Sequence, residues 1–201
     1  DKYQIFLMVL LKSVFLIAIA VVCVGLIGLA SNSVYAGLQA TIGSQGTGNG
    51  EFDQPWGLGV NSTGWIFVAE YYNHRISLFD NSTDHDFVSH IVDPGIRAYA
   101  GTAASNNGDG KLNQPMDVEF DSSDNMWVLE VGNNRLQKFD QHGTFISKFG
   151  SYGTGDGQFY SPKDFAIDPS GNIWVADTNN NRIQKFDSSG NFLLKFGSEG
   201  C

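Results

Sequence analysis

The sequence predicts an all-β protein built from repeated four-stranded antiparallel sheets, arranged as the blades of a β-propeller. Three segments of the chain align with one another, and tight turns separate their strand-like runs. Glycine and aromatic residues are abundant, with 24 Gly and 15 Phe in 201 residues. Glycine suits turns and aromatic side chains favour strands. A repeat of about 40–50 residues that contains several strands is typical of propellers and similar arrays.

The repeat is defined by three segments that align without gaps. In each segment a proline precedes an arginine by 20 residues, and successive prolines are 60 and 47 residues apart. The extra residues of the first copy fall mostly in 81–99, which we interpret as an insertion after the third strand. A glycine-rich lead-in precedes each copy and reads GTGNGEF, NNGDGKL and GTGDGQF. The segments are 54–80, 114–140 and 161–187, and the pairs are Pro55 and Arg75, Pro115 and Arg135, and Pro162 and Arg182.

The third copy shows the strands most clearly. Strand-like runs cover 163–168, 172–177, 182–187 and 191–196, joined by the turns PSG, TNNN and SSG. We expect TNNN to be a turn of Asx type, held by side-chain hydrogen bonds. The run IWVA is apolar at consecutive positions, which predicts that neighbouring blades cover both faces of the sheet.

The shared residues resemble the NHL repeat. The pattern reads G-x-G-D-G-x-F, then Pro, then D-x-x-G-N-I-W-V-A-D, then N-x-R-I-Q-x-F-D, and it covers residues 43–201 in three copies. The resemblance implies a β-propeller, commonly six-bladed, that acts as a scaffold. Six blades at this period need about 280 residues or more. We therefore expect a fragment of a longer propeller, with blades at about 43–100, 101–149 and 150–196 and the start of another at 197–201.

Residues 1–36 form a hydrophobic segment that differs from the repeats. Lys2 and Lys12 are followed by an uncharged run from Ser13 to Ala30, and the letters VYA end at Ala36. This order is typical of a secretory signal peptide. The run is also long enough for an uncleaved membrane-anchor helix. Both alternatives place the predicted propeller, residues 37–201, outside the cytoplasm. We expect a secreted or cell-envelope protein, anchored in the membrane through 13–30 if the helix is not cleaved.

Composition excludes several classes of function. The net charge of −9 and the pI of about 4.7 disfavour binding of nucleic acid, which needs clustered Lys and Arg. The two cysteines, Cys23 and Cys201, do not suggest a disulfide framework or a zinc site. We expect no cofactor. Two sequons fit exposed turns of an exported chain and make Asn61 and Asn81 glycosylation candidates.

The stretch DTNNNR at 177–182 resembles the start of a calcium-binding loop. Arg182 stands where such a loop needs glycine, and Ser188 stands where it needs an acid. An arginine recurs at this place in every copy. A guanidinium can donate to several acceptors at once and tie a turn to a neighbouring strand or Asp. We therefore predict a structural role for all three, Arg75, Arg135 and Arg182.

Catalytic residues do not assemble from the sequence, and none is predicted. The four histidines share no repeat position. Asp117 and Asp164 do share one, two residues after the proline, and are weak candidates for metal ligands, although the first copy has Gly57 there. The alternative function is therefore a metal-dependent propeller lyase or lactonase, with its site on the channel face and completed by blades outside this sequence.

Specialised function is expected where the copies differ. The loops between the second and third strands read YYNH, VGNN and TNNN, and they share one propeller face with the starts of the first strands. Exposed aromatic residues on that face suit contact with proteins or sugars. The binding candidates are Trp56, Tyr71, Tyr72 and His74, and residues 81–99 offer a second surface. We expect a non-catalytic scaffold whose partner is a protein or glycan at the cell surface.

Overall fold

The computed structural model describes residues 41–82, 85–91 and 107–197. The chain separates into two compact units, residues 1–43 and 44–201, and every described strand belongs to the second. The predicted signal or anchor helix lies outside the described residues, as do 92–106 and 198–201. Among the residues that are described, no helix has the length and apolar character needed to cross a membrane.

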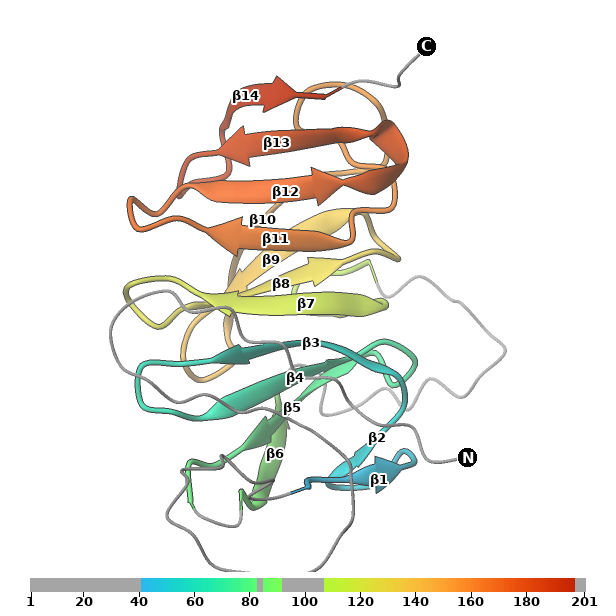
Figure 1. Cartoon of the computed structure of the whole chain (residues 1–201), viewed down its shortest axis with the longest axis vertical. Helices are drawn as coiled ribbons and strands as arrows, with labels where there is room; N and C mark the ends of the chain where they lie inside the picture. Colours follow the sequence, from blue (N-terminus) through green and yellow to red (C-terminus); the bar gives the residue numbers. More distant parts are fainter. Residues whose placement is uncertain (1–40, 83–84, 92–106, 198–201) are drawn as a thin grey trace, which may run out of the picture. The chain divides into compact units, whose positions relative to one another are not determined.

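Three four-stranded sheets and one two-stranded pair make up the described part of the second unit (Figure 1). Each four-stranded sheet is an antiparallel meander in which strands consecutive in sequence are neighbours in space. A short parallel pair, β1 (Ser44–Gln45) and β2 (Glu51–Phe52), precedes the first sheet. The sheets are β3 (Pro55–Val60), β4 (Ile66–Glu70), β5 (Arg75–Phe79) and β6 (Phe87–Ile91); β7 (Pro115–Phe120), β8 (Met126–Glu130), β9 (Arg135–Phe139) and β10 (Phe145–Phe149); and β11 (Asp164–Ile167), β12 (Ile173–Asp177), β13 (Arg182–Phe186) and β14 (Phe192–Phe196).

The predicted all-β class and its four-stranded units are confirmed. Strands β11 to β14 agree with the four runs expected in the third copy to within one residue at each end. The turn between β12 and β13 differs from the prediction. It is a 3₁₀ turn, η1 (Thr178–Asn180), and Asp177 makes no side-chain cap hydrogen bond because its carboxylate points toward Arg182.

Part of the predicted insertion 81–99 is a regular strand. Residues 87–91 form β6, which pairs with β5 and completes the first sheet. The sequence FVSHI occupies the place of FISKF in the second copy and FLLKF in the third. The interpretation of the whole of 81–99 as an insertion was therefore wrong, because its fourth-strand residues are needed to cover β5.

The hydrophobic core lies between the sheets. One cluster joins the first and second sheets and includes Ile76 and Val118, and another joins the second and third and includes Leu129 and Phe165. All five residues of β8 are buried, since this sheet is covered on both faces. In β12 buried and half-buried positions alternate. Consecutive apolar residues therefore mark a strand with two covered faces in the first and second sheets but not in the third.

Glycine allows the first strands of neighbouring sheets to approach one another. These strands, β3, β7 and β11, are called the innermost strands below. A Cβ atom built on Gly57 would lie 2.5 Å from Asp117 Cα, and one on Gly59 would lie 2.6 Å from the carbonyl oxygen of Val118. Real side chains cannot occupy such positions, so β3 must keep glycine there to pack against β7. Strand β7 in turn contacts β11. The three innermost strands thus bring Gly57, Asp117 and Asp164 into one row.

Candidate binding face

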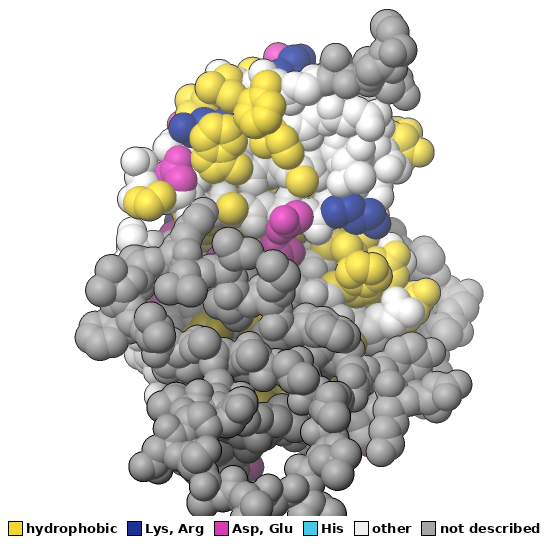
Figure 2. Space-filling view, viewed as in Figure 1, with side chains coloured by type: hydrophobic (Ala, Val, Ile, Leu, Met, Phe, Trp, Pro, Cys, Tyr) yellow, Lys and Arg dark blue, Asp and Glu magenta, His cyan; other side chains and the backbone are white. Residues whose placement is uncertain are grey.

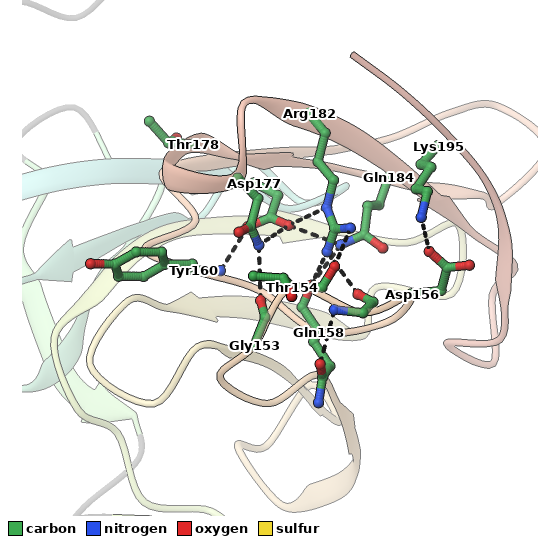
Figure 3. A network of polar contacts seen from close by, with 12 residues as sticks. Gly153, Thr154, Asp156, Gln158, Tyr160, Asp177, Thr178, Arg182, Gln184 and Lys195 are labelled. Carbon is green, nitrogen blue, oxygen red and sulfur yellow. Dashed lines mark hydrogen bonds and ion pairs between the residues drawn. The ribbon is translucent and has the colours of Figure 1, made fainter. Parts of the chain in front are cut away.

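Each sheet is tied to its lead-in by one arginine. In the third sheet the Arg182 Nε donates to Asp177 at 2.7 Å. The two terminal nitrogens donate to the backbone carbonyl oxygens of Thr154, Gly155 and Gln158 at 2.7, 2.7 and 2.8 Å (Figure 3). Four of the five N–H donors of a guanidinium are thereby used within the blade. Arg182 therefore has little capacity left for an anion.

The same arrangement recurs in the other two sheets. Arg75 donates to Glu70 and to three lead-in carbonyls, and Arg135 does the same with Glu130. All three acids are fully buried. Burial raises the pKa of Glu130, and the hydrogen bond and charge of Arg135 oppose that rise. The sequence indicated the arginines but not these acids, which pair directly across the hairpin with the arginine.

The buried acid also fixes the loops of the candidate face. Glu70 accepts hydrogen bonds from the Asp53 N–H and from the Asn73 side chain, in addition to Arg75. Asn73 also donates to the Gly46 carbonyl at 3.1 Å. The loop between β4 and β5 is therefore held to the start of β3 and to the lead-in by one carboxylate.

Three aromatic side chains lie together at this fixed loop, with Tyr71 and Tyr72 in the loop itself and Trp56 near the start of β3. The ring centroid of Trp56 lies 6.3 Å from that of Tyr71, which lies 5.0 Å from that of Tyr72. Trp56 is 61% exposed and Tyr72 is 50% exposed. Tyr71 is half-buried against the core between the second and third sheets, and this burial raises its pKa, with a smaller effect of Tyr72. We call Trp56, Tyr71 and Tyr72 the aromatic platform.

His74 has a different position from the three rings. Its Nδ1 accepts a hydrogen bond from the backbone N–H of Gln114 in the next sheet at 3.0 Å. Asn134 holds the N–H of Ser161 in the same way at 2.8 Å. Burial lowers the pKa of His74, which agrees with a neutral ring that accepts at Nδ1. The structure thus gives His74 a contact between sheets, and its place in a binding site stays a prediction.

Asp117 and Asp164 lie next to each other on the innermost strands β7 and β11. Burial raises the pKa of Asp117 well above its usual range, and the charge of Asp164 and a hydrogen bond with that residue raise it further. Gly57 fills the corresponding place in the first sheet. Within the described ranges, no group of three or more His, Cys, Asp or Glu side chains could hold a metal ion.

The two glycosylation candidates lie close together at the hairpins of the first sheet. The Asn61 Oδ1 accepts hydrogen bonds from the N–H groups of Thr63 and Trp65 at 3.2 and 2.9 Å. Asn81 donates from Nδ2 to the Thr63 carbonyl at 2.8 Å. Asn81 is exposed and Asn61 is half-buried. The side chain of Asn61 therefore shapes its turn, as Asp121 and Asp168 do in the other sheets.

Comparison with known proteins assigns the repeat. The family model described as NHL repeat matches residues 52–79 and 159–186, which cover the first and third copies. The chain carries NHL repeats. The chain is also similar to part of the protein lin-41 of Caenorhabditis elegans, at 41% identity over 49 residues, or 24% of this chain and 4% of that protein.

Solved structures place the NHL repeats of this chain in the β-propeller fold. A streptogramin B lyase matches with a TM-score of 0.52 at 19% identity, over 73% of this chain and 41% of that one. Dihydro-heme d1 dehydrogenase NirN matches with a TM-score of 0.51 at 14% identity, over 75% and 29%. This chain thus spans less than half the length of the structures that it matches. At identities this low, the structural matches show that the fold is shared and nothing beyond the fold.

Proposed function

We propose that this chain belongs to an exported, non-catalytic propeller scaffold that binds a protein or glycan at the cell surface through the aromatic platform. The observation that carries the proposal is the exposure of Tyr72, on a loop that Glu70 and Asn73 hold in place, and of Trp56 in the adjoining strand β3. Rigid aromatic side chains offer contact area at a low cost in conformational entropy, which suits a binding surface. The apolar segment 13–30 and the two sequons support the proposed location.

Site-specific crosslinking tests the proposed binding surface. A photoreactive phenylalanine analogue replaces Tyr72 in the full chain, displayed on cells, and crosslinked partners are identified by mass spectrometry. The same analogue at Tyr152, which is 67% exposed on the third lead-in, is the matched control. We expect a defined partner from position 72 that Trp56→Ala removes. Equal crosslinking from both positions would count against the platform.

Expression in a secretory eukaryotic host tests the proposed export. We expect a mobility shift after treatment with an N-glycosidase, reduced by Asn61→Gln or Asn81→Gln. An unshifted chain that stays accessible only after cell lysis would refute the proposed location.

The alternative function, a metal-dependent lyase or lactonase, receives weaker support. Asp117 and Asp164 stand side by side on the innermost strands, but burial raises the pKa of Asp117 and Gly57 supplies no third ligand. A divalent metal needs deprotonated ligands in larger number. The described residues therefore do not fit a metal centre, and we derive no catalytic step from them.

A further inference from the structure

The aromatic platform stands beside carboxylates rather than beside a neutral surface. Trp56 precedes Gly57, whose position touches the side chain of Asp117, and Asp117 pairs with Asp164. The backbone carbonyl of Asp53 receives the N–H of Tyr72. Figure 2 shows hydrophobic side chains at the right-hand ends of β3 and β7, with acidic and basic side chains next to them.

The carboxylates at this edge have no cationic partner among the described residues. The ion pairs in the described ranges use other acids, and none includes Asp53, Asp117 or Asp164. Lys163 is an exposed cation at the same edge, where it takes the place that Trp56 has in the first sheet. The whole chain carries a net charge of −9. The negative net charge of the chain and the carboxylates at this edge together favour a cationic ligand over an anionic one.

We propose that the aromatic platform receives an extended polypeptide segment through an Arg or Lys side chain, which lies against the exposed indole of Trp56 and places its charge toward Asp117 and Asp164. This inference rests on the proposed binding function and names the chemistry of the partner. A cation over an indole face is attracted by the ring and gains more where carboxylates lie close by. A neutral sugar could stack on the rings but would leave the acid pair without a partner.

The raised pKa of Asp117 gives this binding a distinctive property. Burial and the neighbouring charges of Asp164 and Glu119 disfavour the ionised form of Asp117. A guanidinium or ammonium group beside Asp117 stabilises its ionised form and lowers that pKa. Below the raised pKa, binding of the cation is therefore coupled to proton release from Asp117, and affinity rises with pH.

Calorimetric titration of the full chain tests the inference. The probe is the acetylated and amidated peptide Gly-Gly-Arg-Gly-Gly-Arg-Gly-Gly, compared with its Glu-substituted form and with neutral chitohexaose. We expect the Arg peptide to bind and release protons, as seen in buffers of different ionisation enthalpy. Trp56→Ala and Asp117→Asn each weaken binding by about 5- to 10-fold. Asp86→Asn, the same charge change at the exposed turn before β6, leaves the affinity unchanged.

The possible outcomes separate the two proposals. Equal binding of the Arg and Glu peptides, or binding that ignores Asp117→Asn and Asp164→Asn in folded variants, overturns the inference. Binding of chitohexaose that depends on Trp56, without binding of the Arg peptide, overturns the cationic partner and keeps the platform. A platform to which none of the three probes binds counts against both. Position 57 of the first sheet lacks a carboxylate altogether, so removal of one at 117 is expected to leave the fold intact.

Discussion

At the scale of single residues, one buried carboxylate organises each blade. Glu70, Glu130 and Asp177 have no solvent exposure, and each meets an arginine directly across a hairpin. Burying an ion pair brings little net stability, because desolvation offsets the attraction. Breaking such a pair is costly, because the remaining charge is left buried. These pairs therefore determine which loop geometry is possible more than they add to the free energy of folding.

Removal of one partner should reveal this asymmetry. Arg135→Ala leaves Glu130 buried without its cation and should lower the free energy of unfolding by about 3–5 kcal/mol, measured by urea denaturation. The double variant Glu130→Gln with Arg135→Ala should lose clearly less than the sum of the single changes, because no charge remains buried. Strictly additive losses would show that the two side chains are not coupled.

The arginines were predicted from the repeat, but the buried acids that pair with them were missed. A residue that recurs at one position of every copy serves the blade, so the role of Arg182 followed from the repeat itself. Asp187 also recurs, but it caps its own turn by accepting hydrogen bonds from the N–H groups of Ser189 and Asn191. The acid at the end of the second strand could have been predicted as the partner of the arginine, because the residues on either side of a hairpin turn face each other.

At the scale of elements, the first sheet departs from the other two in its third and fourth strands, β5 and β6. Gln137 and Gln184 each bridge the buried acid and the lead-in. The first sheet has Ser77 there, which bonds Glu70 and lies 2.9 Å from the Nδ1 of His90 on β6. Strand β6 was missed in the sequence because the turn before it is longer than the turns before β10 and β14. This difference in length hid the alignment of the fourth strand with the other copies.

His90 makes the first sheet sensitive to acid. Burial, together with the charge of Arg75, lowers the pKa of His90 to about 4, below its ordinary value of 6.5. Above pH 6.5 the ring is neutral in both states. As the pH falls from 6.5 toward 4, the unfolded chain takes up a proton that the folded chain resists, so stability is lost.

We expect this loss to be on the order of 1–2 kcal/mol, since the ring is only half-buried and solvent screens part of the effect. The matched variant Ser77→Gln with His90→Lys copies the second sheet and should not show this loss. Urea denaturation at several pH values measures both proteins. Parallel pH profiles would remove His90 as the cause.

Packing between innermost strands depends on glycine in the first sheet. Gly57→Ala places a methyl group 2.5 Å from the Cα of Asp117, where only backbone movement can relieve the contact. We expect a loss of about 1–3 kcal/mol in the free energy of unfolding. Gly108→Ala is the control, because its added Cβ meets only Lys111 Cγ at 3.5 Å. Equal effects of the two changes would show that the close approach does not limit packing.

At the scale of the whole molecule, a blade is buried only where a neighbour covers it. Trp127, Leu129 and Leu136 of the second sheet are almost fully buried against the third. On the far face of the third sheet, Ala176, Ile183 and Phe196 instead line an open hollow. The sequence predicted covered faces throughout from runs such as IWVA, and burial bears this out for β4 and β8 but not for β12, which contains that run.

This exposed face should promote self-association of the chain. Phe196 is 55% exposed and Leu194 is 43% exposed. Contiguous apolar surface at a sheet edge favours contact with further chains. We expect Phe196→Lys to shift sedimentation of the 201-residue chain toward smaller species at micromolar concentration. Ile146→Lys, at a similarly exposed position of β10, should have less effect. Unchanged sedimentation of both variants would exclude this face.

In the loop after β4, the residues that hold the loop in place are not the residues that are exposed. This difference affects how the surface can change during evolution. Asn73 and Arg75 fasten the loop through the buried Glu70, while Tyr72 contributes only its backbone to those bonds. A side chain that makes none of the contacts holding the loop can be substituted without disrupting the sheet. Each blade thus offers an interchangeable position on a constant frame, and new recognition can arise by point substitution while the architecture is inherited unaltered.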